Sequence, residues 1–185
     1  MPKIERLGHI GLYVLDLNRS LAFYRDLLGL HVTDTVAGRK IAFLSARPDE
    51  EHHELVLCEG RTVAPNEFLI QQISFRCNSL EDVLAYHRIL TAHNVRIQYT
   101  VSHGNAVGAY FYDPDGNICE VYWPTGLHAR QGFLQGLDFS QTPEQLMALV
   151  REYVDRYGKT GYRDPALAML QHEIKPAAVG SSTAS

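Results

Sequence analysis

The chain has 185 residues, of which 45% are hydrophobic, and its formal net charge is −4. This length suits one domain of ordinary size or one domain with an appendage, and the hydrophobic fraction is enough for a packed core. A negative balance without a Lys/Arg cluster argues against nucleic acid as a partner, and no apolar run approaches the roughly 18–20 residues that span a membrane. Three cysteines without paired spacing, after a start unlike a signal peptide, indicate reduced thiols and a cytoplasmic protein.

The first third of the chain predicts a βαβββ unit. Its elements are a strand over 7–14, a helix over 16–30, and strands over 30–36, 40–46 and 53–59. Either Asp16 or Asn18 is expected to cap the helix, and Gly29 suits its C-terminal end.

The same unit then recurs. It comprises a strand over 69–77, a helix over 79–93, and strands over 95–101, 107–112 and 117–123. The run Asp113-Pro114-Asp115-Gly116-Asn117 predicts a tight hairpin turn between the last two strands. Residues 60–68 link the two units.

The composition changes after Pro124. Residues 126–140 look irregular, Thr142-Pro143-Glu144 is a helix start, and a shorter helix is expected over 165–173. An apolar stripe follows the helix start: Leu146, Leu149, Val150, Tyr153, Val154 and Tyr157. We expect a partner subunit or the mouth of the binding site to cover this stripe, with the outer face of the same domain as the alternative. Residues 175–185 are Ala/Ser-rich and are expected to be disordered.

The repeat puts His9 and Gln72 at equivalent positions. Strand alternation places both on the face opposite the apolar one, and it does the same for Glu54 and Glu120. A duplicated unit relates equivalent residues by a pseudo-twofold axis, so a metal site can be assembled from both halves. The alternative is that these polar side chains simply lie on the solvent-exposed faces of antiparallel sheets.

Three segments carry a family resemblance: Gly8-His9-Ile10, the run from Leu21 to Leu30, and the run from Tyr110 to Glu120. Through them the chain resembles the vicinal oxygen chelate superfamily, which includes glyoxalase I, type I extradiol dioxygenases, fosfomycin resistance enzymes and bleomycin-binding proteins. The resemblance implies an α+β fold in which paired βαβββ modules form a half-open curved mixed sheet cup around a divalent metal. The expected organisation is a two-module domain over 1–125 (modules about 7–60 and 69–125), a helical extension over 126–174 and the tail over 175–185.

The resemblance also implies a set of site residues. The metal ligands would be His9, Gln72 and Glu120, with Glu54 as a possible fourth. Extradiol dioxygenases show a longer pattern, which His103, Tyr110, Asp113-Pro114, Gly116 and Glu120 follow here. This pattern implies that His103 and Tyr110 are catalytic groups beside the substrate.

Three functions remain open at this point. The first is an extradiol-type dioxygenase that uses Fe(II) on a catechol-like substrate, although Gln72 stands where such enzymes have a second His. The second is a glyoxalase I-like isomerase or lyase with a four-ligand site for Ni(II), Zn(II) or Co(II); Mn(II) is a further alternative for the metal. The third is a metal-free protein that binds a drug or metabolite. Family members are commonly homodimers that act on small molecules, and we expect the same here.

Overall fold

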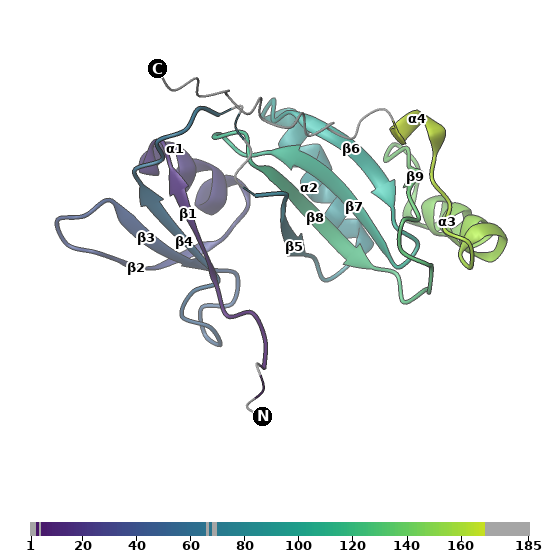
Figure 1. Ribbon diagram of the computed structural model, residues 1–185, viewed down its shortest axis with the longest axis horizontal. Coiled ribbons are helices and arrows are strands. Elements are labelled where there is room, and N and C mark those ends of the chain that lie inside the picture. Colours follow the sequence, from purple (N-terminus) through teal and green to yellow (C-terminus); the bar gives the residue numbers. More distant parts are fainter. Residues whose placement is uncertain (1–2, 4, 66, 68–69, 169–185) are drawn as a thin grey trace, which may run out of the picture.

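The computed structural model describes residues 3, 5–65, 67 and 70–168, and it confirms the duplicated βαβββ organisation (Figure 1). The part of the short C-terminal helix that was expected beyond residue 168, and the tail expected over 175–185, lie outside the described residues.

The first module contains four strands and one helical segment. Its elements are β1 (Ile10–Val14), α1 (Leu17–Leu21), η1 (Ala22–Leu27), β2 (His31–Thr35), β3 (Ile41–Ser45) and β4 (Leu55–Glu59). The strands form a mixed sheet in the order β1-β4-β3-β2, in which β1 and β4 run parallel and the other neighbours run antiparallel.

The helical segment begins and ends with local signals that the sequence carries. Of the two expected caps, Asp16 is the one used, because its side chain accepts a hydrogen bond from the Arg19 N–H. The segment is not one regular α-helix, since η1 has π-helical bonding and the Leu28 N–H reaches the Phe23 carbonyl at 3.0 Å, five residues back. Gly29, at φ 80°, then ends it in the left-handed region that favours glycine.

The second module repeats the arrangement and gains one strand. Its elements are β5 (Ile73–Arg76), α2 (Leu80–Ala92), β6 (Ile97–Ser102), β7 (Ala106–Tyr112) and β8 (Ile118–Pro124). The short strand β9 (Gln135–Gly136), from the segment expected to be irregular, adds to β6 and gives the sheet order β5-β8-β7-β6-β9. We call the face of this sheet opposite α2 its open face.

The two parallel strand pairs have matching registers but different residues. Gly11 on β1 lies opposite Val56 on β4, and at the equivalent positions Ser74 on β5 lies opposite Glu120 on β8. The second module therefore carries a carboxylate at a place where the first module carries a valine.

The two modules share one hydrophobic core. It includes Val14 and Tyr24 from the first module and Phe111 and Cys119 from the second, all with no exposed surface. The rings of Phe23 and Phe111 lie 6.1 Å apart across the boundary. Cys119 is thus a core residue, as the strand pattern predicts, and burial raises the pKa of its thiol above the usual range.

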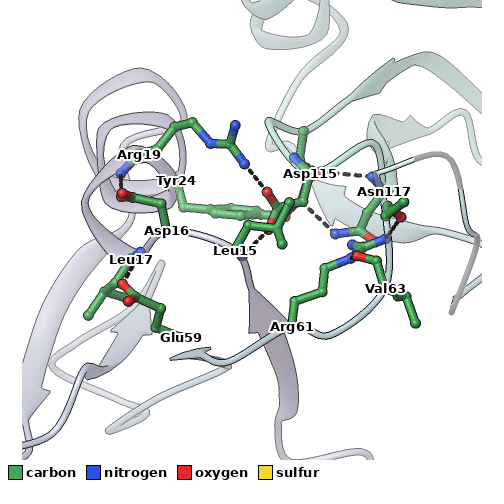
Figure 2. A network of polar contacts seen from close by, with 12 residues as sticks. Leu15, Asp16, Leu17, Arg19, Tyr24, Glu59, Arg61, Val63, Asp115 and Asn117 are labelled. Atoms are coloured by element: carbon green, nitrogen blue, oxygen red, sulfur yellow. Dashed lines mark hydrogen bonds and ion pairs between the residues drawn. The ribbon is translucent and has the colours of Figure 1, made fainter.

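The predicted turn between β7 and β8 is confirmed, and it ties the two modules together (Figure 2). Asp115, fully buried, accepts a hydrogen bond from the Leu15 N–H at 2.8 Å and forms an ion pair with Arg19. Asp113 accepts a hydrogen bond from the hydroxyl of Tyr24 at 2.7 Å. Side chains of the second module thereby satisfy polar groups at the end of β1 and on the first helix.

A buried arginine holds the other side of the same turn. Arg61 donates to Asn117 Oδ1 at 3.0 Å and to the Val63 carbonyl at 3.2 Å (Figure 2). Gly116 has φ 81°, and a Cβ there would lie 2.2 Å from the Pro65 carbonyl oxygen, so only glycine fits. The Asp-Pro-Asp-Gly-Asn segment that contributes to the family resemblance therefore has a structural role, since it fixes the modules relative to one another.

The helix α3 (Pro143–Tyr157) begins at Thr142 with the predicted start signal and a full capping box. Its apolar stripe contacts the same chain: Leu146 and Val150 are buried in a cluster with Leu80, Leu84 and Val107. The expectation that a partner subunit or the mouth of the site covers this stripe is therefore wrong for α3, and the outer face of the same domain covers it. The single helix α2 is too narrow for a five-stranded sheet, so α3 covers the remainder.

The rest of the extension reaches the open face. After α3 the chain returns beside β9 and forms α4 (Pro165–Ala168), whose Leu167 packs in a cluster with Tyr99 and Tyr112. The extension thus encloses the β6 edge of the second sheet from both faces (Figure 1). No helix in the described part of the chain is long and apolar enough to cross a membrane.

Candidate functional site

Four strands of the second sheet bring one row of polar side chains onto the open face. Tyr99 on β6 pairs with Tyr110 on β7, Tyr110 with Glu120 on β8, and Glu120 with Ser74 on β5. Paired residues point to the same face, so all four point away from α2. With strands about 4.8 Å apart, the row extends over about 14 Å.

Glu120 is the charged group of this row, and it is 5% exposed. Its Oε2 accepts hydrogen bonds from Ser74 Oγ at 2.6 Å and from Gln72 Nε2 at 3.3 Å. Gln72 Nε2 also donates to Ser74 Oγ at 2.7 Å, so the three side chains form one cluster. The structure therefore brings together two of the candidate ligands, Gln72 and Glu120.

A glycine makes room for this carboxylate. A Cβ added to Gly108 on β7 would lie 2.6 Å from Glu120 Oε1 and 3.2 Å from the Val121 carbonyl oxygen. The backbone of Gly108 is not left-handed, so the requirement for glycine comes from space rather than from conformation.

Both candidate catalytic residues belong to the same site. His103 Nε2 lies 3.0 Å from the Tyr110 hydroxyl, and His103 Nδ1 lies 3.3 Å from the Phe133 carbonyl oxygen. A carbonyl can only accept, so Nδ1 donates, and Nε2 of the neutral ring then accepts from Tyr110. Tyr110 also lies opposite Glu120 in the β7–β8 pair, so the carboxylate acts on the Tyr110 hydroxyl through its negative charge.

Burial and charge keep the tyrosines of the row protonated. Burial, followed by the negative charge of Glu120, raises the pKa of Tyr110 well above its usual value of 10.0. The same two causes, in the same order, raise the pKa of Tyr99, while Arg163 acts in the opposite direction. Both hydroxyls therefore remain available as donors across the physiological pH range.

The third candidate ligand, His9, lies elsewhere. It is exposed, and its ring packs on His53 with the centroids 4.3 Å apart. Leu15, at the other end of β1, contacts the β7–β8 turn, and from this contact β1 and β8 diverge (Figure 1). In the described part of the chain no hydrogen bond or ion pair joins His9 to Gln72 or Glu120.

Glu54 is directed into its own module. Its carboxylate accepts hydrogen bonds from the Ala46 N–H at 2.9 Å and from Arg47 Nη2 at 3.0 Å. Burial would raise the pKa of Glu54, but these two partners together hold it below the usual value. Glu54 also precedes Val56, the equivalent of Glu120, by two residues. Within the described residues, no group of three or more His, Cys, Asp or Glu side chains is arranged to bind a metal ion.

The chemistry of the Glu120 cluster nevertheless fits a divalent metal. A buried ionised carboxylate needs a cation or several hydrogen bonds to offset its desolvation. The neighbours of Glu120 are neutral (Ser74, Gln72 and Tyr110), and no Lys, Arg or His ion pair to it occurs in the described part of the chain. Carboxylate and amide oxygens are ligands for Mn(II), and carboxylates also bind Fe(II).

Sequence reasoning did not assign a role to Ser74, Gly108 or Tyr99. Strand alternation carries the signal for each of them: Ser74 is two residues after Gln72, and Gly108 is two residues before Tyr110. What the sequence lacks is the register between strands, which puts these residues in contact with Glu120.

Comparison with known proteins assigns the chain to a family. The Glyoxalase/Bleomycin resistance protein/Dioxygenase superfamily matches residues 6–121, more than half of the chain, and the protein belongs to this superfamily. The fosfomycin resistance protein FosX of Listeria monocytogenes shares the mixed α+β fold, with a TM-score of 0.55 and 25% identity over 66% of this chain and 94% of that one.

Two relatives carry dioxygenase names. The chain is 32% identical over 124 residues to the manganese-dependent 2,3-dihydroxybiphenyl 1,2-dioxygenase of Geobacillus genomosp. 3. The match covers 65% of this chain and 37% of that protein. The chain is also 29% identical over 128 residues to biphenyl-2,3-diol 1,2-dioxygenase 3 of Rhodococcus globerulus. This match covers 65% of this chain and 64% of that protein. The chain thus spans less than two thirds of the length of these relatives.

Proposed function

We propose that the protein is a metal-dependent enzyme that cleaves the ring of a catechol-like substrate by extradiol chemistry. The observation that carries this proposal is the buried Glu120 carboxylate, which lies among neutral donors and beside the hydrogen-bonded pair Tyr110–His103. The dioxygenase relatives support it, and one of them is named for manganese. The ligands would be Glu120, Gln72 and His9, with Fe(II) or Mn(II) as the metal.

A bound Fe(II) or Mn(II) ion would supply Lewis acidity and reactivity toward oxygen. The protein's own contribution starts with Gln72, whose amide nitrogen faces Glu120. A half-turn of the terminal amide would present its oxygen, which is the ligand atom. Because an amide oxygen is a harder donor than imidazole, this ligand set suits Mn(II) better than a site with two histidines would.

His103 and Tyr110 would handle the proton of the substrate. The Phe133 carbonyl fixes the His103 N–H on Nδ1, which leaves Nε2 as the atom that takes and returns a proton. Tyr110, protonated, bonded to His103 and lying opposite Glu120 in the sheet, would orient a substrate hydroxyl. The Tyr99 ring, 4.6 Å from that of Tyr110, would pack beside the aromatic substrate.

His9 would come from a second copy of the chain. β1 and β5 are both edge strands of their sheets, and the segment around β1 exposes Leu7 (83%) and Tyr13 (64%). If β1 of one subunit lies beside β5 of the other, the exposed His9 approaches Gln72 and Glu120, and these apolar residues become covered. Each homodimer would then contain two sites built from both subunits.

Complementation between variants tests this arrangement. His9→Ala and Glu120→Gln should each abolish metal binding as homodimers, whereas a refolded mixture should regain binding in heterodimers, which contain one intact site. No recovery in a mixture that sedimentation shows to contain heterodimers would rule out the shared site.

The other two functions have weaker support. A four-ligand isomerase site needs Glu54, whose carboxylate is engaged by Arg47 and the Ala46 N–H. A metal-free binding protein would leave the buried charge of Glu120 offset only by hydrogen bonds from neutral groups. The ring-cleavage proposal therefore remains the one that the site supports best.

The decisive experiment is anaerobic metal analysis followed by a catechol-cleavage assay. We expect stoichiometric Fe(II) or Mn(II) binding and a yellow ring-cleavage product. Gln72→His should raise the affinity for Fe(II), because imidazole suits iron better than an amide oxygen. Tight metal binding without turnover of any catechol, in both the wild type and Gln72→His, would sink the proposal.

A further inference from the structure

The C-terminal extension delivers an arginine to the open face of the second sheet. Arg163 pairs in parallel with Leu134, the residue just before β9: the Leu134 N–H bonds to the Tyr162 carbonyl, and the Asp164 N–H to the Leu134 carbonyl at 2.6 Å. Leu134 lies in the open-face cluster that includes Tyr110. Since paired residues point to the same face, Arg163 points there too.

The neighbouring residues agree with this placement. Tyr162 points to the opposite face, where its ring lies 5.8 Å from that of Phe133 and 5.1 Å from that of Tyr153. Alternation along the chain then returns Arg163 to the side of Tyr99. The positive charge of Arg163 lowers the pKa of Tyr99 against the larger raising effects of burial and Glu120, so the guanidinium lies within electrostatic reach of that ring.

The charge of Arg163 is not neutralised by a neighbouring acid. Arg163 forms no ion pair with a carboxylate in the described part of the chain. The adjacent Asp164 is turned to the backbone, where its oxygens accept from the Gly136 N–H at 3.2 Å and the Ala166 N–H at 2.9 Å. An unneutralised guanidinium beside aromatic rings is suited to a planar anion.

The open face beside Arg163 is apolar and aromatic. Leu134, Leu167, Tyr99 and Tyr112 line it, and the guanidinium of Arg96 stacks 3.5 Å above the Tyr112 ring. From β8, which carries Glu120, to β6, which carries Tyr99, the distance is two strand spacings, or about 10 Å. Glu120 and Arg163 both act electrostatically on Tyr99, so an aromatic ring over Tyr99 would have Glu120 at one edge and Arg163 at the other.

We propose that Arg163 determines specificity by binding a carboxylate of the substrate, so that the substrate class is an acidic catechol rather than a neutral one. This inference rests on the proposed function for the position of the two hydroxyls at Glu120. The extension then has a functional reason to wrap around β6, because it completes the far wall of the site.

Binding measurements without turnover test this proposal. Anaerobic calorimetry on the metal-loaded full-length protein would compare 3,4-dihydroxyphenylacetate with its neutral amide. The wild type should bind the acid at least about tenfold more tightly, as expected for a charge-assisted bidentate contact. Arg163→Gln should reduce this preference to less than about twofold, and Arg163→Lys should keep part of it.

Arg156→Gln is the matched control, because Arg156 is an exposed arginine on α3 whose nearest acid is Glu152 at 4.0 Å. It should leave the preference unchanged. No preference for the acid in the wild type, or the same preference in Arg163→Gln, would overturn the role of Arg163.

A third probe separates this outcome from failure of the proposed function. Phenylacetate lacks the two hydroxyls and should bind more weakly than the dihydroxy acid. If it binds equally well and loses affinity in Arg163→Gln, Arg163 keeps its role and the ring-cleavage proposal fails.

Discussion

The two modules have the same backbone arrangement and opposite surface chemistry. Across the open face of the second sheet, paired residues form the row Ser74, Glu120, Tyr110 and Tyr99. At the equivalent places in the first sheet the row is Gly11, Val56, Phe43 and Asp34. The hydrogen-bonding groups of the first three positions are thus absent from the first module.

This difference shows that the repeat conserves geometry while the chemistry is concentrated in one half. Phe43, in the place of Tyr110, packs against the rings of His52 and His53, and the nearby Glu54 binds Arg47. The first module therefore contributes one candidate ligand, His9, from the end of β1. If this difference matters for function, equivalent substitutions in the two modules should have unequal effects.

The largest effect is expected when the carboxylates of Glu120 and Glu54 are each replaced by an amide. Glu120→Gln should weaken Mn(II) binding by at least about 100-fold, because the proposed site would lose its charged ligand and not only a supporting group. Glu54→Gln should leave metal affinity unchanged. Titration followed by electron paramagnetic resonance measures both. Equal losses in the two variants would mean that the first module supplies a second carboxylate ligand.

The β7–β8 turn holds the two modules in their relative positions, so its loss should lower the stability of the protein. Asp115→Ala should lower the free energy of unfolding by about 2–3 kcal/mol, because it leaves the Leu15 N–H and the Arg19 charge without their buried partner. Asp26→Ala, which breaks an exposed ion pair with Arg25, should have no measurable effect. Urea unfolding gives both values, and similar results for the two variants would show that the turn does not hold the modules together.

A smaller effect is expected at Gly108 on β7 of the second sheet than at the carboxylates, and none at Gly11 on β1 of the first. In Gly108→Ala the new methyl group would meet Glu120 Oε1 at 2.6 Å and displace the carboxylate, so metal affinity should fall about tenfold. In Gly11→Ala the new methyl group would lie 4.0 Å from Val56 Cβ, an ordinary contact, and affinity should be unchanged. Unchanged affinity in Gly108→Ala would show that the carboxylate does not need its present position.

The smallest effect concerns pH. Tyr99 and Tyr110 have pKa values raised above 10.0, by burial first and then by Glu120. A group whose pKa is higher in the folded state than in the unfolded state contributes to the free energy of unfolding. That contribution is complete below the unfolded-state pKa and is lost as the pH rises through the folded-state pKa. Unfolding free energy should therefore decline only above about pH 10. In a phenolate absorbance titration, Glu120→Gln should shift ionisation of these two tyrosines to lower pH, and an unshifted titration would exclude the influence of Glu120.

Much of the fold could be predicted from the sequence because its signals are local. Alternation and helical periodicity located the strands and helices of both modules, and Thr142 and Asp16 marked two helix starts. The short strand β9 was missed, because two residues carry no periodicity and pair only where the β6 edge is available. The packing of α3 was also misjudged, since the apolar stripe indicates that cover is needed but not which surface provides it.

For the candidate site, the sequence determined which side chains share a face of each strand, and it marked Gln72, Glu120, His103 and Tyr110 as candidates. Only the tertiary structure decided the contacts among them, because contact depends on register between strands and not on alternation within one. It places Glu120 beside Ser74 and Gln72, directs Glu54 to Arg47, and leaves His9 at the far end of β1. The position of Arg163 on the open face likewise follows from its pairing with Leu134, a contact between segments that no local pattern connects.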